Sequence, residues 1–404
     1  MIKTLTSAFK NKDIRKKLLY TLMMLVVIRI GSLLPIPGVD TEYFSTLLSG
    51  FNSGDLSYLS AFTGGSFEKM SLFALSITPY ITSSIIMQLL TIAIPKLEEM
   101  QKEGEDGRKK IASITRYVTI ALALIESIAM AVGFGRQGLI KDYKDMSTIH
   151  YVTCIIVVVA ALTAGSAVLM WIGERITEKG VGNGISIVLL INIISGMPSD
   201  FVTLYSTFVA NKSIARGVTV AVIIAAIVIA VVVLVVILQD GERRIPVQYS
   251  QKVAGRKTIG GQATNIPLKV NTAGVMPIIF ASSIMQFPVI IVQLFTSNSY
   301  EWTKYLSQSY WCRVQMPKYS IGLLLYIILV VVFAYFYTSI TFNPVQIADN
   351  LKKAGGVVPG ITPGRSTSEY LNKILNYIVF IGAVGLMIVA LIPIMCTGFF
   401  NASV

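Results

Sequence analysis

The chain has 404 residues, of which 54% are hydrophobic and only 14% are charged, and its formal net charge is +13 at pH 7. This composition is too apolar for a soluble domain of that length. The charge would point to nucleic acid only if basic residues formed one stripe on a soluble face, and here they are spread over separate loops. Three scattered cysteines without a CxxC pair imply no disulfide framework.

Nine apolar segments follow one another along the chain, and most approach the ~20 residues that cross a bilayer. They are Leu18–Leu34, Met70–Ile94, Ile111–Val132, Tyr151–Ile172, Ile185–Gly196, Val218–Leu238, Val275–Gln293, Ile321–Ile340 and Ile374–Ile394. The fold class predicted is therefore all-α, a polytopic membrane helix bundle. No cleavable signal peptide is expected, because the basic start leads into a segment too long for one.

The positive charges are distributed unequally between the two sets of alternating connectors. One set holds 23 Lys and Arg residues and the other holds 9, while Arg29 and Arg116 lie within spans. Cytoplasmic loops carry the positive excess, so we expect the N-terminus in the cytoplasm.

Residue types that catalysis needs are scarce. The single histidine, His150, leaves little from which to build a His-based metal site or catalytic triad. Gly133–Gly138 matches G-x-G-x-x-G, but it follows a predicted membrane helix rather than a strand, which argues against dinucleotide binding. No phosphate-binding G-x-x-x-x-G-K-[ST] motif occurs, so any energy from nucleotide hydrolysis must come from a partner. We expect no enzyme activity, no cofactor and no metal.

Only Arg29 and Glu126 lie well inside the predicted spans. A charge at the centre of a bilayer costs ~2.5–3.5 kcal/mol on insertion scales, so each invites a functional interpretation. Ion-coupled pumps usually show several buried carboxylates, whereas this chain shows one. The residues alone leave two interpretations of Glu126 open, a functional group or a lone interhelical hydrogen-bond partner.

Three segments differ from ordinary spans. The connector Pro37–Lys69 contains apolar residues without a full span, which suggests a short re-entrant helix or a plain extracellular loop. The fifth segment opens with Gly180–Gly184 and contains Asn192, so we expect it to line the bundle interior. Pro79 predicts a bend in the second segment, because proline removes a helix hydrogen bond.

Two predicted cytoplasmic loops, Gln239–Pro267 and Asn343–Leu371, are long and combine turn residues with basic residues. The bias toward positive cytoplasmic loops could supply the charge, but it does not explain the length. We therefore expect a docking face for a large partner, such as anionic ribosomal RNA.

Five strings carry a resemblance to a known family. They are Arg29–Gly38 (RIGSLLPIPG), Phe73–Ile81 (FALSITPYI), Lys102–Lys110 (KEGEDGRKK), Gly173–Ser186 (GERITEKGVGNGIS) and Val270–Pro277 (VNTAGVMP). Together they resemble the SecY family of protein-conducting channels over nearly the whole chain. The resemblance implies two halves with inverted pseudo-symmetry around an hourglass pore, here residues 1–200 and 201–404.

The resemblance also implies roles for individual residues. The pore waist would be a ring of Ile77, Ile81, Leu189 and Ile279, where apolar side chains oppose water and ions by dewetting. A plug would occupy about residues 57–69, and its positions are Leu59, Phe62, Thr63, Gly64, Gly65 and Ser66. A lateral gate would carry a polar cluster of Thr82, Glu126 and Asn271, which favours the functional interpretation of Glu126.

The two long loops would form the docking surface for the ribosome and the SecA ATPase. Candidate contacts are Arg243, Arg244, Lys252, Arg256, Lys257, Lys352, Lys353 and Arg365. Further partners implied are small SecE-like and SecG-like membrane subunits, signal peptides, nascent chains and membrane lipid. The location implied is the bacterial cytoplasmic membrane.

Two departures from the family pattern stand out. Thr362 stands where the family usually has arginine, and Arg365 follows three residues later. The family has ten spans, and the sequence reaches Val404 after the ninth, so we expect a truncated sequence rather than a natural nine-span channel. The alternative function is a secondary solute transporter, which would also show inverted repeats and a broken helix.

Overall fold

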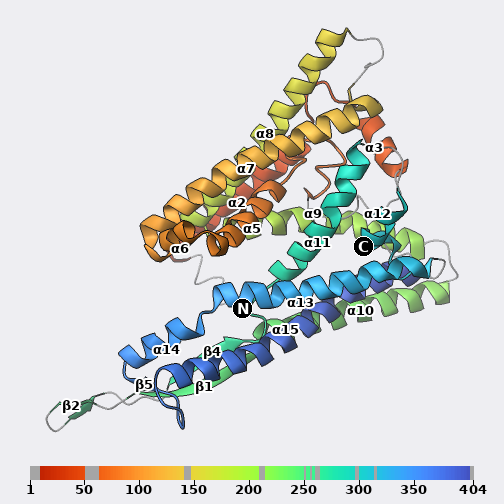
Figure 1. The fold of residues 1–404 in the computed structure, drawn as a ribbon. Coiled ribbons are helices and arrows are strands. Elements are labelled where there is room, and N and C mark those ends of the chain that lie inside the picture. The colour runs from red at the N-terminus through yellow and green to blue at the C-terminus, as the bar shows by residue number, and fades with distance from the viewer. Residues whose placement is uncertain are drawn as a thin grey trace. The chain divides into compact units, whose positions relative to one another are not determined.

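The computed structural model describes residues 10–50, 63–140, 147–208, 214–249, 252–254, 257–259, 264–295, 300–313 and 316–400, and most of them are helical (Figure 1). The expected helical membrane bundle is thereby confirmed. The chain divides into two compact units. Unit 1 holds Met1–Thr203 with Ile290–Ser299, and unit 2 holds Leu204–Val289 with Tyr300–Val404. Inverted symmetry between two halves stays a prediction.

Each of the nine apolar segments overlaps a helix, although the second segment is helical only from Thr78 onward. These are α2 (Lys12–Leu33), α5 (Thr78–Ala93), α7 (Glu105–Phe134), α8 (Thr148–Lys179), α9 (Gly184–Phe208), α10 (Ile214–Asp240), α11 (Met276–Phe295), α13 (Ile321–Thr341) and α15 (Arg365–Phe400). Within the described ranges, six helices are long and apolar enough to cross a membrane, and α5 with α6 (Pro95–Lys102), bent by 106°, would make a seventh. Helix α2 is less apolar because Lys16, Lys17 and Arg29 lie along it.

In unit 1, α5, α7 and α8 pack side by side (Figure 1). The hydroxyl of Ser83 on α5 donates to the carbonyl oxygen of Thr115 on α7 at 2.8 Å, which fixes the register of these two helices. The predicted bend at Pro79 is wrong: Pro79 lies in the first turn of α5, where its missing N–H costs nothing. Residues 70–77, expected within the second span, form turns instead of helix.

Unit 1 also contains α3 (Thr41–Gly50) and a π-helical turn, η1 (Gly135–Leu139). The G-x-G-x-x-G string therefore lies at the end of α7 and in this turn, and no strand precedes it among the residues that the structure describes. Phe44 of α3, Phe67 and Phe134 of α7 meet edge to face, with ring centroids 5.2 to 6.4 Å apart. This aromatic cluster joins α3, the segment after residue 62 and α7 in one core.

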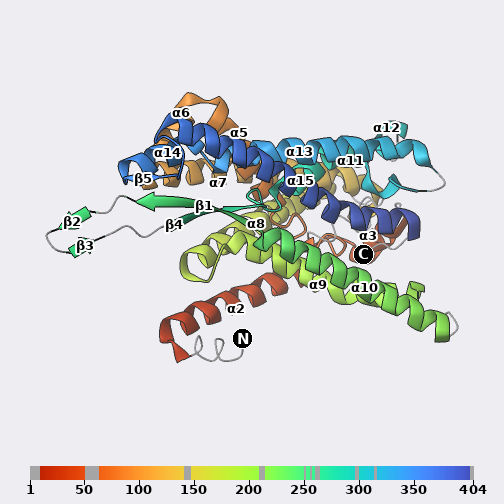
Figure 2. The same ribbon diagram turned by 90° about the horizontal axis from the view of Figure 1, so that it is seen from below.

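In unit 2, the first long loop is a sheet rather than irregular turns. Strand β1 (Glu242–Tyr249) pairs antiparallel with β4 (Thr264–Lys269) and with β5 (Gly356–Val357), and β2 (Lys252–Ala254) pairs with β3 (Lys257–Ile259). Figure 2 shows β1 beside β4, with β2 and β3 at their far end. Sequence reasoning missed these strands because the alternation of Ile245, Val247 and Tyr249 in β1 is brief and lies within a basic loop.

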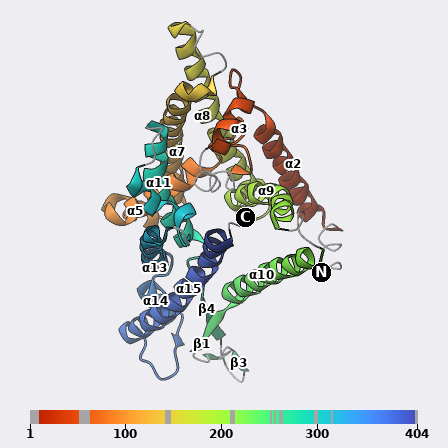
Figure 3. The same cartoon turned by 90° about the vertical axis from the view of Figure 1, so that its right-hand side faces the viewer.

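The two long loops of unit 2 fold against each other. Ile245 and Val247 of β1 are buried in one core with Leu351 at the end of α14 (Pro344–Lys353) and with Leu371 of α15. Figure 3 shows α10 leading into β1, near β4. The remaining described elements of unit 2 are α12 (Glu301–Leu306), η2 (Gln308–Tyr310) and η3 (Pro317–Ser320).

Candidate functional site

Three of the four predicted ring residues meet in one apolar cluster of unit 1. Ile77 is the N-cap of α5 and is completely buried, while Ile81 of α5 and Leu189 of α9 are partly buried against the same cluster. The fourth residue, Ile279, lies on α11 in unit 2 and is partly exposed.

The predicted plug is described only from Thr63 onward, so Leu59 and Phe62 lie outside the described residues. We call Thr63–Met70 the plug stem. Thr63 and Ser66 are buried, and the hydroxyl of Thr63 accepts a hydrogen bond from the backbone N–H of Phe67 at 3.3 Å. Phe67 fixes the stem in the aromatic cluster described above.

Gly64 brings the plug stem against α9. A Cβ built on Gly64 would lie 2.6 Å from the hydroxyl oxygen of Ser195 and 2.7 Å from the carbonyl oxygen of Asn192. A Cβ built on the neighbouring Gly65 would have no atom within 4 Å. Only glycine at position 64 therefore permits this close approach, whereas position 65 has open space.

The polar groups of α9 at this contact form a chain of hydrogen bonds. Arg29 donates through Nη1 to the hydroxyl of Ser195 at 2.8 Å, and that hydroxyl donates to the carbonyl oxygen of Asn192 at 2.7 Å. Asn192 donates through Nδ2 to the hydroxyl of Ser76 at 3.0 Å. We call Arg29, Ser195, Asn192 and Ser76 the polar latch, since it ties α2, α9 and the turn before α5 together.

The three predicted gate residues are divided between the units. Thr82 donates to the carbonyl oxygen of Thr78 at 3.1 Å within α5. Glu126 is partly buried on α7, eleven residues beyond Thr115 and hence about 16 Å further along the helix axis from the Ser83–Thr115 bond. Asn271 of unit 2 donates to Gln239 at 3.4 Å, and its Oδ1 has no hydrogen-bond partner among the described residues.

The predicted docking residues lie in unit 2, on the sheet and on two helix ends. Arg243 and Arg244 are exposed on β1, and Arg244 Nε bonds Glu242 Oε1 at 2.6 Å. Lys352 and Lys353 are exposed in the last turn of α14, where cations complement the helix dipole. Arg365 begins α15 and pairs with Glu369 at 3.0 Å.

The tip of the first loop is described only in part. The backbones of Lys252 and Lys257 lie on the hairpin strands β2 and β3. Arg256 lies outside the described residues.

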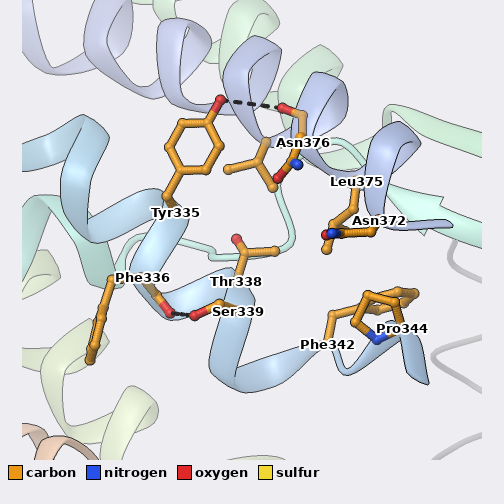
Figure 4. Close-up of a pocket in the computed structure, with 10 residues that line it drawn as sticks. Tyr335, Phe336, Thr338, Ser339, Phe342, Pro344, Asn372, Leu375 and Asn376 are labelled. Carbon is orange, nitrogen blue, oxygen red and sulfur yellow. Dashed lines mark hydrogen bonds between the residues drawn. The ribbon is translucent and has the colours of Figure 1, made fainter. Parts of the chain in front are cut away.

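A cavity of about 350 Å³ lies between α13 and α15 in unit 2 (Figure 4). Tyr335 of α13 donates to the carbonyl oxygen of Asn376 on α15 at 3.3 Å, and Ser339 donates to the carbonyl oxygen of Phe336 at 2.7 Å. Its lining is uncharged, with Asn372 and Asn376 on one wall. The cavity is therefore suited to neutral groups rather than to an ion.

Sequence reasoning missed the anchoring role of Phe67 and most of the polar latch. Arg29 and Asn192 are conspicuous as polar residues in apolar segments. However, Ser195 lies 166 residues from Arg29, and Ser76 lies 116 residues from Asn192. Ser195 and Ser76 carry no distinguishing pattern. Only the contact across the fold identifies them.

The sequence matches a family model described as SecY over residues 71–403. The protein translocase subunit SecY of Corynebacterium glutamicum is 41% identical over 395 residues, covering 96% of this chain and 87% of that protein. The SecY subunit of Halalkalibacterium halodurans is 40% identical over 401 residues, covering 98% and 89%.

Two solved channel structures share the fold. One, described as "The structure of a protein conducting channel", gives a TM-score of 0.61 at 17% identity and covers 96% of this chain and 86% of that one. The other, "Sec61 in the Canine ribosome-channel complex from the endoplasmic reticulum", gives 0.58 at 16% identity and covers 96% and 91%.

Proposed function

Because the chain belongs to the SecY family, we propose that it conducts unfolded secretory polypeptides through an apolar constriction and releases apolar helices sideways into lipid. The protein is a multi-pass membrane protein and a subunit of a protein-conducting channel. A secondary solute transporter, the alternative, is not favoured by these relatives. Channel subunits of this kind are not a known enzyme family.

The observation that supports the constriction best is the cluster formed by Ile77, Ile81 and Leu189. A ring of such side chains yields to any polypeptide, because it makes no specific polar contact. It also opposes ions, because a narrow apolar throat loses its water. Ile279 of unit 2 would supply the fourth side of this ring.

The plug stem and the polar latch would keep the resting channel closed. The stem is held by Phe67 on one side and by the close contact of Gly64 with α9 on the other. The gate cluster of Thr82, Glu126 and Asn271 would contribute a weaker bias, since a hydrogen bond between membrane helices is worth about 1 kcal/mol. An apolar signal helix could displace it, gaining ~0.3–0.6 kcal/mol for each Leu or Ile that enters lipid.

The exposed cations of unit 2 would bind the partners that drive transport, either the ribosome or the SecA ATPase. Arg243, Arg244, Lys352 and Lys353 are available on one folded unit, and Arg365 would replace the arginine that the family has at Thr362. SecE-like and SecG-like subunits would complete the channel. The N-terminus would lie in the cytoplasm, and the membrane would be the bacterial cytoplasmic membrane.

Glu126→Gln separates the two functions. A channel predicts altered gating with most secretion kept, because the side chain only biases closure. A transporter predicts that uptake of its solute is abolished, because the only carboxylate well inside a span is lost. Translocation of a secretory polypeptide into vesicles, measured by protease protection, decides between them, and loss of all transport in the variant would contradict the channel proposal.

A further inference from the structure

The cavity between α13 and α15 combines an apolar floor with an uncharged polar rim (Figure 4). Leu375 and Val379 of α15 line it and are buried. Asn372 and Asn376 of the same helix also line it, and both are exposed. The cavity is therefore open to the surface on the side of the two asparagines.

The side-chain amides of these two asparagines are available to a ligand. Neither amide has a hydrogen-bond partner in the described part of the chain, since Tyr335 bonds only the backbone carbonyl oxygen of Asn376. The hydroxyls of Thr338 and Ser339, by contrast, donate to carbonyl oxygens of their own helix at 2.8 and 2.7 Å. Each free amide offers N–H donors and one carbonyl acceptor.

The spacing of the two amides matches an extended polypeptide. Asn372 and Asn376 are four residues apart, so they lie on one face of α15 and about 6 Å apart along its axis. An extended chain presents the N–H and C=O of every second residue on one side, with a repeat of about 6.6 Å. One side-chain amide can pair with both groups of one such residue, because it carries a donor and an acceptor.

Other ligands fit this lining less well. Among the described residues, no charged side chain lines the cavity, so a phosphate or a carboxylate would have no counter-ion there. A hydrocarbon chain would cover the floor but leave both amides unpaired, which is unfavourable in apolar surroundings. The volume of about 350 Å³ lies at the lower end of the range for ligand sites, about 300–1,000 Å³, so a short segment of chain would fill it.

We propose that this cavity binds a short, uncharged segment of an unfolded polypeptide in extended form, with the backbone of two alternate residues paired to Asn372 and Asn376. Because the polar contacts are to the backbone, the site accepts many sequences with small or apolar side chains. The choice of an unfolded polypeptide as the ligand rests on the proposed function, whereas the pairing rests on the geometry of the cavity. The apolar cluster of Ile77, Ile81 and Leu189 lacks such pairing, so the two sites differ in chemistry.

Photolabelling with a peptide tests the pairing without transport. The probe is a short peptide of alanine and serine, blocked at both ends and carrying a benzophenone, and the full chain is held in phosphatidylcholine nanodiscs. We expect mass spectrometry to find its adducts on α13 and α15 around the cavity. A peptide methylated on every second backbone nitrogen should label as well, because one side of its backbone keeps the N–H groups. Methylation of every backbone nitrogen should reduce labelling about 30-fold, as expected for the loss of two hydrogen bonds.

Variants of the two asparagines test the same bonds from the side of the protein. Asn372→Leu with Asn376→Leu should reduce labelling about 30-fold, whereas Asn372→Gln with Asn376→Gln keeps both amides and should keep most of the labelling. Asn350→Leu is the matched control, because Asn350 is exposed on the neighbouring helix α14 but does not line the cavity. The methylated peptides use the unaltered chain, so the test does not depend on how the leucine variant folds.

A crosslinking residue in the cavity tests whether a conducted polypeptide reaches it. The full chain with Ser339→p-benzoylphenylalanine is reconstituted in vesicles, a secretory polypeptide is arrested during passage, and translocation is measured by protease protection. We expect polypeptide adducts at position 339. Leu324→p-benzoylphenylalanine should give lipid adducts instead, because Leu324 is 61% exposed near the other end of α13 and does not line the cavity.

Three results would overturn the proposal. One is equal labelling by the fully methylated peptide, and another is unchanged labelling of Asn372→Leu with Asn376→Leu. The third is capture of lipid or of a second copy at position 339, in place of the polypeptide, while protease protection continues. Absence of protected polypeptide with the unaltered chain would instead contradict the proposed function, and peptide labelling would still decide whether the pairing exists.

Discussion

The guanidinium of Arg29 on α2 donates a hydrogen bond to the hydroxyl of Ser195 on α9 at 2.8 Å, joining residues 166 positions apart. The same hydroxyl oxygen is the atom nearest to a Cβ built on Gly64. The hydroxyl of Ser195 thus accepts a hydrogen bond from a cation on α2 and also forms part of the surface on which the plug stem rests. We infer that the latch couples the packing of α2 and α9 to the position of the stem.

Ser195→Ala should loosen the plug stem. It leaves Arg29 without its acceptor, and a hydrogen bond to a charged group is worth about 1.5–3 kcal/mol. The readout is the rate at which a maleimide labels Thr63→Cys, in a background from which the native cysteines have been removed. A loss of about 2 kcal/mol corresponds to a rate increase of about 30-fold.

Ser199→Ala is the matched control, because Ser199 is exposed one turn further along α9 and donates to its own helix at Gly196. Its labelling rate should equal that of the parent. An equal rate in the Ser195 and Ser199 variants would show that the latch does not hold the stem.

Gly64→Ala should open the resting channel to ions. The added methyl group would overlap Ser195 and Asn192 of α9, so the stem must move away. Gly65→Ala provides a close control, since both glycines have positive φ, 62° and 79°, but only position 64 is crowded. Ion current through planar bilayers should rise for Gly64→Ala well above the level of Gly65→Ala, and similar currents would remove the steric explanation.

Ile81→Asn should increase ion leak, because an amide in the apolar cluster holds water where a hydrocarbon ring would exclude it. Ile279→Asn should act in the same direction from unit 2. Ile92→Asn tests specificity, as Ile92 lies on the same helix as Ile81 but is 52% exposed and outside the cluster. Conductance of reconstituted vesicles measures all three, and a leak that is as large in Ile92→Asn counts against the ring.

Reversing charge at Arg243 and Arg244 should weaken ribosome binding in a salt-dependent way. Both side chains are exposed, so their contribution is electrostatic and is screened as ionic strength rises. Cosedimentation at 50 and 200 mM salt should show a flatter salt dependence for Arg243→Glu with Arg244→Glu. Lys304→Glu changes the charge on α12, outside both long loops, and this control variant should bind the ribosome as the parent does. Retained ribosome affinity in Arg243→Glu with Arg244→Glu would exclude this docking face.

The membrane helices could be predicted from the sequence because the bilayer imposes a length and polarity that hydropathy reveals directly. Each of the nine segments overlaps a helix for that reason. The turns at residues 70–77 were missed because they are as apolar as the helix that follows. The strands β1 and β4 were missed because their partner strands, not their own pattern, stabilise them.

Some residues of the candidate site could be predicted from the sequence and others could not. Ile77, Ile81 and Leu189 follow from the family resemblance, and the structure packs all three into one hydrophobic cluster of unit 1. The contact of Gly64 with Ser195 and the bond of Asn192 to Ser76 could not be predicted, because they depend on packing between segments far apart in the chain.

The central claim is that polypeptides pass through the apolar cluster, and crosslinking a stalled chain tests it most directly. A photocrosslinking residue replaces Ile81, or Ile92 as the exposed reference on α5, and a secretory polypeptide is arrested halfway through reconstituted vesicles. The account predicts adducts to the polypeptide at position 81 and lipid adducts at position 92. Capture of no polypeptide at position 81, while translocation continues, would contradict it.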